Sequence, residues 1–488
     1  MLLSSAVRSR PSSRAGALAH ALTAAAVTAL VGPAATASPL EDPWIGGILF
    51  TGPAHEHPSA VYINPAMLGR DTGHHLFLAG TLRLDRVEID RAAIDPATGV
   101  AVSGAGDAAA ASHLSPGWMF AGSTDFAQDR FTVGVGIYVP VAETFPGGEE
   151  ALRYHSLGGH HYAQFWTLSL AIRAHDRAYF GASLSGATSR LSLGFARDTA
   201  LEGGSAGLQS ECGGEPCGAE NPQATQRYDV SVSRPLSVGF QLGAAVEVAA
   251  GWWLGLGWLV PPGSLGGLDV PMDGDVRVDR APRAGGGTVE ADARVVVRLP
   301  QSVYVGLQGR IAPRWNLVGG ARWTDLSRHE LLDLRMFGAG VAASDIPEWY
   351  PRRRGLQDNL MLEGGIEGVA RQRLRPGVRV RLETSGVSDQ SLSAAQVGGL
   401  NLSLAGGLEW RPLDGGFALA LGYAFTWFPE RTADPQGFDP AARVACVDSM
   451  FDLETCIPAR EGRALPTAAG DYRHLRHAWS LSVRYDWF

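Results

Sequence analysis

Lysine is absent from this chain, and all 41 basic residues among its 488 are arginine. Charge is also scarce, because charged residues make up 18% of the chain against a usual ~25%. So little charge argues against a coiled coil, a disordered acidic tail and an ordinary helical enzyme. The formal net charge of −8 offers no basic face, so we expect no nucleic-acid partner.

Cysteine is rare as well. The four present are Cys212, Cys217, Cys446 and Cys456, and each neighbouring pair lies in a polar, loop-like stretch. In an oxidising compartment this arrangement favours two local disulfides. Zinc binding is the alternative, but the spacing is not C-x-x-C and histidine is sparse nearby. We therefore expect no metal site at these cysteines.

Long apolar runs are almost missing after the N-terminus. Leu242–Val260 is long enough to cross a bilayer as a helix, but it contains four glycines and Glu247. A charge in mid-membrane is costly, so a spanning helix is a poor interpretation. We predict a hairpin instead, turning at Ala249–Gly251.

Catalytic motifs are not evident. We find no P-loop, G-x-S-x-G, H-E-x-x-H or dinucleotide fingerprint in the sequence, which predicts neither an enzyme nor a cofactor. Histidines occur close together at His55 and His57, at His74-His75 and at His160-His161, without a carboxylate or cysteine at ligand spacing. We interpret them as surface or interface residues.

The first 37 residues have the pattern of an export signal. Arg8, Arg10 and Arg14 precede an apolar stretch over Ala17–Gly32, and Ala35-Thr36-Ala37 offers a cleavage site. Residues 1–37 are therefore predicted to be a signal peptide, and the mature protein leaves the cytoplasm.

The mature chain alternates polar and apolar residues over runs long enough for tilted membrane strands. Fourteen strands are predicted, at 75–89, 114–123, 131–140, 161–173, 178–193, 236–247, 252–260, 300–311, 315–326, 359–369, 374–384, 399–410, 416–428 and 472–487. Long and short intervals alternate between them, as in bacterial outer-membrane barrels. The fold prediction is an all-β, 14-stranded antiparallel transmembrane barrel over residues 75–488, in the outer membrane of a Gram-negative bacterium.

The side chains on these strands predict two faces. Aromatic residues near strand ends suit interfacial girdles, namely Trp315, Trp323, Trp427, Phe428, Trp479 and Trp487. Many lumen positions are small and uncharged, but Arg310, Arg322 and Glu383 also fall on lumen positions. We expect these three to anchor a plug, or alternatively to meet a ligand carboxylate.

Residues 38–74 precede the first strand and do not alternate, so we predict a plug, or hatch, inside the barrel. Its run Ser59–Gly69 contains Asn64-Pro65-Ala66 and resembles the hatch motif of the FadL family of outer-membrane long-chain fatty acid transporters. Leu299–Leu307 with Trp315-Asn316-Leu317 and Trp323-Thr324, and Gly470-Asp471-Tyr472, resemble two further family segments. The resemblance covers the whole mature chain in order.

Membership of that family would imply passive uptake of hydrophobic molecules by a monomeric barrel, without cofactor or ATP. Long-chain fatty acids are the first expected ligand and aromatic hydrocarbons the second. The hatch motif Asn64, Pro65 and Ala66 would fix the plug, and residues 38–50, including Leu40 and Trp44, would reach an internal ligand site near Tyr138. The resemblance also implies release either when the hatch shifts or through a wall opening near the third strand. That strand is predicted to end at Pro140, which lacks the N–H of the ladder, so two interpretations stay open there: a local break in the wall, or a proline that simply ends the strand.

The resemblance also implies two general partners, outer-membrane lipid and the barrel assembly machinery. Two alternatives stay open from the sequence. One is a structural or secretion-accessory barrel of the same fold, and the other is a porin for polar solutes.

Overall fold

The computed structural model describes residues 42–94, 101–102, 108–147, 152–198, 225–263, 269–329, 331–344, 346–369, 373–388, 391–412, 416–433 and 468–487. They belong to one compact unit, residues 35–488. The predicted signal peptide, Leu40 and all four cysteines lie outside the described residues. Those assignments, including the two disulfides, therefore stay predictions.

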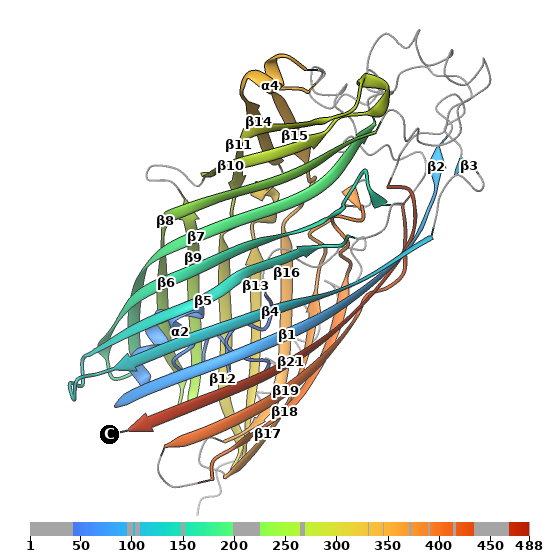
Figure 1. The fold of residues 1–488 in the computed structure, drawn as a ribbon. Helices are drawn as coiled ribbons and strands as arrows, with labels where there is room; N and C mark the ends of the chain where they lie inside the picture. Colours follow the sequence, from blue (N-terminus) through green and yellow to red (C-terminus); the bar gives the residue numbers. More distant parts are fainter. Residues whose placement is uncertain are drawn as a thin grey trace, which may run out of the picture. The chain divides into compact units, whose positions relative to one another are not determined.

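Fourteen antiparallel strands form a closed ring (Figure 1). In ring order they are β1 (His74–Arg91), β4 (Ala108–Thr124), β5 (Phe131–Phe145), β6 (Gly158–His175), β7 (Ala178–Asp198), β8 (Thr225–Ala249), β9 (Trp252–Gly263), β12 (Ser302–Ala312), β13 (Trp315–Thr324), β16 (Asn359–Gly368), β17 (Leu374–Glu383), β18 (Asn401–Trp410), β19 (Phe417–Trp427) and β21 (Gly470–Trp487). The pairing of β1 with β21 closes the ring. All fourteen predicted strands are confirmed in order.

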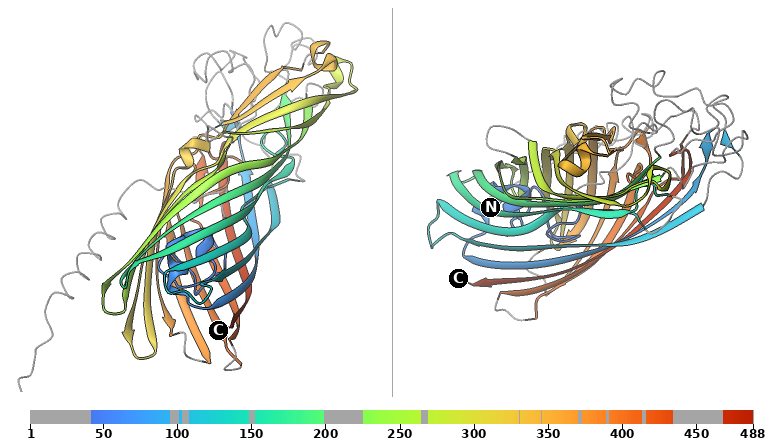
Figure 2. Two further views of the ribbon diagram at one scale, coloured as in Figure 1. Left: turned by 90° about the vertical axis from the view of Figure 1, so that its left-hand side faces the viewer. Right: turned by 45° about the horizontal axis from the view of Figure 1, so that its top comes forward.

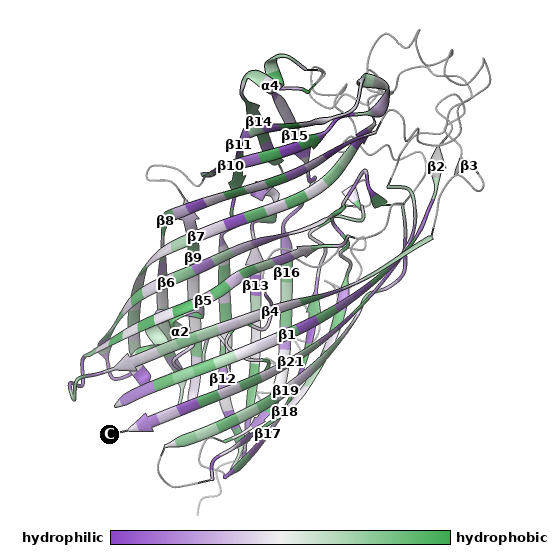
Figure 3. Ribbon diagram, viewed as in Figure 1, coloured by the Kyte–Doolittle hydropathy of each residue, from purple (hydrophilic) through white to green (hydrophobic). Residues whose placement is uncertain are grey.

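Hydrophilic and hydrophobic residues are interspersed along the strands (Figure 3), and the exposed apolar ones face outward from the ring. In β1, Leu76 and Leu78 are exposed, whereas Phe77 and Ala79 between them are buried. Such a ring exposes apolar side chains to lipid while every strand has a partner on both sides. The segment 242–260 forms the predicted hairpin, with β8 and β9 paired.

Within the described residues we find no helix with the length and apolarity that a membrane crossing requires.

The aromatic prediction is wrong at one position. The five tryptophans predicted at strand ends are exposed on the outer face, but Phe428 is buried at 4% exposure. Its ring stacks on the imidazole of His474, with ring centroids 3.9 Å apart. Phe428 follows the last residue of β19, so it turns inward and does not continue the outer phase.

Additional strands lie in segments predicted as loops. They are β10 (Asp269–Asp279), β11 (Thr288–Arg298), β14 (Leu331–Phe337) and β15 (Trp349–Arg353). Pairing in the order β8, β10, β11, β14, β15 extends the sheet beyond the ring at its long-loop end (Figure 2). Shorter elements are α4 (Ala339–Ala342), η6 (Pro282–Ala284), η7 (Leu326–His329), β20 (Arg431–Ala433), which pairs with β21, and the hairpin β2 (Ala93–Ile94) with β3 (Ala101–Val102).

The lining of the ring changes along its axis. Near the short-turn end, the buried inward side chains of β7 and β8 are small or polar, as at Ser185 and Gln241. Toward the long-loop end the same two strands bury Leu193, Tyr228 and Val230. The two zones meet at a register shift between Ala187 and Ser189 of β7. Such a bulge changes which residues of the paired strand, β8, point inward.

The N-terminal segment, residues 42–73, lies inside the ring (Figure 2, blue). It contains α2 (Ala60–Ile63) and the 3-10 helix η1 (Pro65–Arg70), and most of its side chains are buried. Its hydrogen bonds reach strands around the ring, including β8, β12, β16, β17 and β21.

Candidate functional site

Asn64 holds the N-terminal segment at the start of η1. Its side-chain oxygen accepts a hydrogen bond from the backbone N–H of Ala66 at 3.2 Å, and Pro65 takes the first helical position. Its side-chain amide donates to the carbonyl oxygens of Pro53, at 2.8 Å, and of Ala244 in β8, at 3.1 Å. One residue of the predicted motif therefore caps a helix and joins the segment to the wall.

Glycines in the wall leave room for this motif. A Cβ on Gly243 would lie 2.2 Å from Oδ1 of Asn64, and one on Gly255 would lie 1.9 Å from the carbonyl oxygen of Pro53. Any side chain at either position would displace the segment. The close approach of the two backbones explains the glycines in the 242–260 hairpin.

A buried carboxylate ties the segment to a second part of the wall, at β16. Glu367 in β16 is 0% exposed and accepts from the backbone N–H of Phe50 at 3.0 Å and from His55 at 3.1 Å. The guanidinium groups of Arg375 and Arg379 donate to it at 3.2 and 2.8 Å. Four donors around one fully buried carboxylate provide the partners that a buried charge requires.

Of the three predicted lumen charges, Arg322 lies beside the segment and Glu383 lies beside Arg322. Arg322 and Glu383 are both buried and contact each other at 3.5 Å. Arg322 lines a small cavity of about 50 Å³ with Tyr62 of the segment. Trp44 is buried under Arg381, whose guanidinium carbon lies 3.9 Å from the ring centroid.

Arg310 is exposed and lies elsewhere. It lines a polar pocket of about 420 Å³ at the short-turn end, together with Gln308, Asp71 and Arg484. Arg484 donates to both oxygens of Asp71, at 2.8 and 3.0 Å. Burial, and secondarily the positive charge of Arg484, lowers the pKa of the nearby His57 well below its usual value, so this imidazole is neutral and accepts from Ser59.

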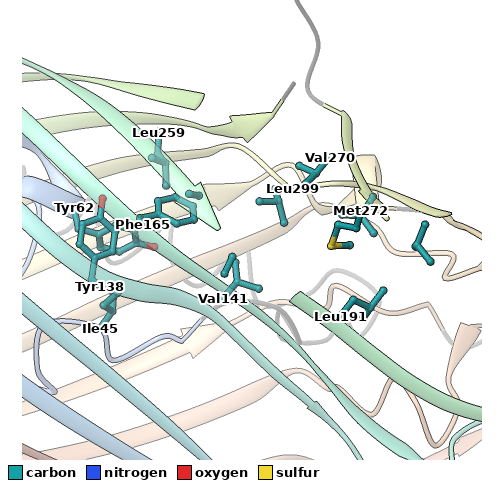
Figure 4. Packing of buried hydrophobic residues seen from close by; sticks show 14 of the residues in the cluster. Ile45, Tyr62, Tyr138, Val141, Phe165, Leu191, Leu259, Val270, Met272 and Leu299 are labelled. Carbon is teal, nitrogen blue, oxygen red and sulfur yellow. The ribbon is translucent and has the colours of Figure 1, made fainter. Parts of the chain in front are cut away.

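Next to the segment is an apolar interior that contains several aromatic side chains (Figure 4). Tyr62 of the segment packs against Tyr138 of β5, with ring centroids 5.1 Å apart, and Tyr138 packs against Phe165 of β6 at 5.7 Å. Ile45, Leu259, Leu299 and other residues complete the cluster. The side chain of Tyr138, which was predicted to be a lumen residue, is fully buried against the N-terminal segment.

A few polar groups interrupt this interior toward the long-loop end. Arg354 pairs with Glu143 of β5 across the lumen, and both side chains are buried. His161 and His329 stack with ring centroids 6.0 Å apart. Burial, with a contribution from Arg354, lowers the pKa of His329 in η7 well below its usual value, so the imidazole is neutral.

The wall has a break beside Tyr138. β4 and β5, both described in full, share six residue pairs that end at Met119 and Tyr138. Pairing of β5 with β6 is also shifted between Tyr138 and Val141. Pro140 lies within this irregular stretch, where the wall opening was predicted.

Groups inside the lumen bind carbonyl oxygens of β5 beyond its last pair with β4. The backbone N–H of Asp42 donates to the Pro140 oxygen at 2.8 Å, and Arg83 donates to the Ala142 oxygen at 2.6 Å. The Asp42 carboxylate in turn accepts from Thr81 at 2.7 Å. The start of the N-terminal segment thus closes the break from within.

Sequence reasoning did not single out Asp42, Arg83, Glu367 and Arg379, the residues that hold the N-terminal segment and the break. Three of them, Arg83, Glu367 and Arg379, are charged residues at inward positions of predicted strands. Their position in the polar–apolar alternation could have identified them. Asp42 had no comparable signal, because its role depends on the distant residue Pro140.

Comparison with known proteins agrees with this architecture. The family model described as outer membrane protein transport protein (OMPP1/FadL/TodX) matches residues 47–363. A Pseudomonas aeruginosa FadL homologue is similar in structure, with a TM-score of 0.69, 16% identity and coverage of 93% of this chain and 100% of that chain. The Ralstonia pickettii toluene transporter TbuX is similar with a TM-score of 0.56 and 15% identity, and the match covers 90% of this chain and 96% of that one. The P. putida toluene transporter TodX is similar with a TM-score of 0.57 and 13% identity, and the match covers 88% of this chain and 94% of that one. No curated protein sequence matches the chain.

Proposed function

Because the chain belongs to the OMPP1/FadL/TodX family of outer membrane transport proteins, we propose that it takes up hydrophobic molecules passively through its lumen. The observation that carries the proposal is the apolar cluster around Tyr138, which lies between the long-loop end and the N-terminal segment. Apolar molecules gain by leaving water for such a lining.

Aromatic hydrocarbons are the substrate class that the geometry favours. The cluster presents aromatic rings, and the buried Arg322 and Arg354 already pair with Glu383 and Glu143. An uncharged ring needs no cation, and two similar structures are those of toluene transporters. Long-chain fatty acids are the second candidate, because Arg310 in the polar short-turn pocket offers a fork for a carboxylate.

In the proposed route, the sheet extension at the long-loop end collects the molecule and the Tyr138 cluster holds it. The N-terminal segment acts as the hatch, fixed by Asn64, Pro65 and Ala66, and the break near Pro140 is the exit. The barrel would act as a monomer in outer-membrane lipid after insertion by the barrel assembly machinery.

A polar-solute porin is disfavoured by the buried segment inside the ring, since a general porin keeps a water-filled lumen. A structural barrel that carries nothing would show no saturable ligand binding. Uptake into proteoliposomes tests the proposal directly, with labelled toluene and labelled oleate as separate probes. We expect saturable uptake of at least one probe, and uptake no faster than into protein-free vesicles would refute the function.

A further inference from the structure

An apolar groove on the outer face of the ring adjoins the break in the wall. The groove has a volume of about 500 Å³ and crosses β4 to β8. Every residue that lines it is uncharged, and exposed side chains such as Phe120, Trp166 and Leu168 form its sides.

Ile137 connects this groove to the break. It lines the groove and pairs with Phe120 on one side and with Trp166 on the other. The next residue, Tyr138, is the last of β5 to pair with β4. A molecule that passes through the wall at this point therefore reaches the groove without crossing another strand.

The floor of the groove is also the wall of the internal cluster. Thr167 and Ser185 line the groove, and their hydroxyl groups lie 2.7 Å apart. The Tyr138 hydroxyl contacts Thr167 at 2.7 Å from the lumen side. One layer of sheet therefore separates the internal apolar cluster from the outer groove.

We propose that this outer groove is a receiving site for an uncharged apolar molecule, which it holds after the molecule leaves the lumen at the break and before it enters the bilayer. This inference rests on the proposed function. The expected ligand class is a compact hydrocarbon such as a monocyclic aromatic, since the uncharged lining offers no partner for a carboxylate. A lipid acyl chain is the alternative occupant, and the experiment distinguishes the two.

A second groove on the outer face of the ring provides a matched control. Gly186 lines the groove, and a Cβ there would meet only Leu236 at 3.3 Å, Trp166 at 3.9 Å and Ser237 at 4.0 Å. Gly80 lines a second outer groove of about 700 Å³, formed by β1, β18, β19 and β21, where a Cβ would meet nothing within 4 Å. Leucine at either glycine fills a groove without entering the lumen.

Uptake of labelled toluene into proteoliposomes should fall at least fivefold in Gly186→Leu and change less than twofold in Gly80→Leu. Equal uptake by the two variants would overturn the receiving site while leaving the proposed function intact. Absence of uptake by the unsubstituted protein would overturn both, so the two failures are distinguishable.

A second measurement decides the matter if Gly186→Leu does not insert. Leu168 in the groove and Leu421 in the second groove are each 58% exposed. With benzoylphenylalanine at one or the other position, illumination during uptake should link several times more tritiated toluene at 168 than at 421. Equal labelling would mean that bilayer lipid occupies both grooves, and the inference would be wrong.

Discussion

Glu367 shows how single residues attach the N-terminal segment. Its carboxylate is fully buried and binds two arginines, a histidine and the backbone N–H of Phe50. Removing one partner of a buried ion pair is more destabilising than the pair itself is stabilising, because the remaining charges lose their solvation as well as their partner.

Glu367→Gln should therefore lower the free energy of unfolding by about 3 kcal/mol, in line with other broken buried pairs. Urea titration in detergent measures the change. Glu430→Gln is the control, because Glu430 pairs with Arg473 on the exposed surface, where solvent screens the ion pair and its loss changes stability little. Equal effects of the two substitutions would contradict the assignment.

Gly255 attaches the N-terminal segment in another way, by leaving space for its backbone. A side chain there would overlap the Pro53 carbonyl oxygen, which also accepts from Asn64. Gly255→Val should leave the barrel folded but loosen the segment, so that added protease cuts within residues 42–73 several times faster. Gly364→Ala is the control, since a Cβ there meets nothing within 4 Å. Equal cleavage would argue against close packing at Gly255.

At the scale of elements, the apolar outer face of the ring explains why the sequence could predict its strands. Lipid requires apolar side chains outward on every spanning strand, so alternation located all fourteen in order. The requirement for an apolar outer face passed over β10, β11, β14 and β15, although polar and apolar residues also alternate along β10 and β11. There the outer face is charged, as in the pair of Asp273 with Arg294, and the apolar face turns inward.

The break between β4 and β5 was predictable only in part. Pro140 signalled an interrupted ladder, because proline has no N–H to donate. The groups that bind the carbonyl oxygens of Pro140 and Ala142 are Asp42 and Arg83, which approach through the folded lumen. Their positions depend on tertiary structure, so local pattern could not reveal them.

Asp42→Ala should loosen this break without unfolding the ring. The substitution removes the carboxylate that accepts from Thr81 and faces Arg83, so the start of the segment loses its fixed position. Hydrogen exchange followed by mass spectrometry should show faster exchange in residues 141–145. Asp90→Ala, at an exposed position of β1, is the control. Unchanged exchange would mean that Asp42 does not hold the break.

At the scale of the whole molecule, the ring and its N-terminal segment form one hydrogen-bonded body. The segment reaches both β8, through Asn64, and β16, through Phe50. Water and ions should therefore find little free cross-section in the described lumen.

Conductance in planar bilayers tests this expectation. The full protein should show small, rare openings, whereas deletion of residues 38–69 should produce stable channels with at least tenfold greater conductance. Circular dichroism of the deletion variant should still report β-structure, which confirms that the ring has formed. Stable channels in the full protein would favour the porin alternative.

Under the proposed function, the reversal of faces in the sheet extension would set where a hydrophobic molecule loses its hydration shell. Beyond the membrane, β10 and β11 turn Asp273 and Arg294 to water and bury Met272 and Val295 on the other side. On that route, dehydration would begin at the mouth, before the bilayer is reached. Selection between substrates should accordingly track how readily each compound partitions out of water, and only afterwards its fit against Tyr138.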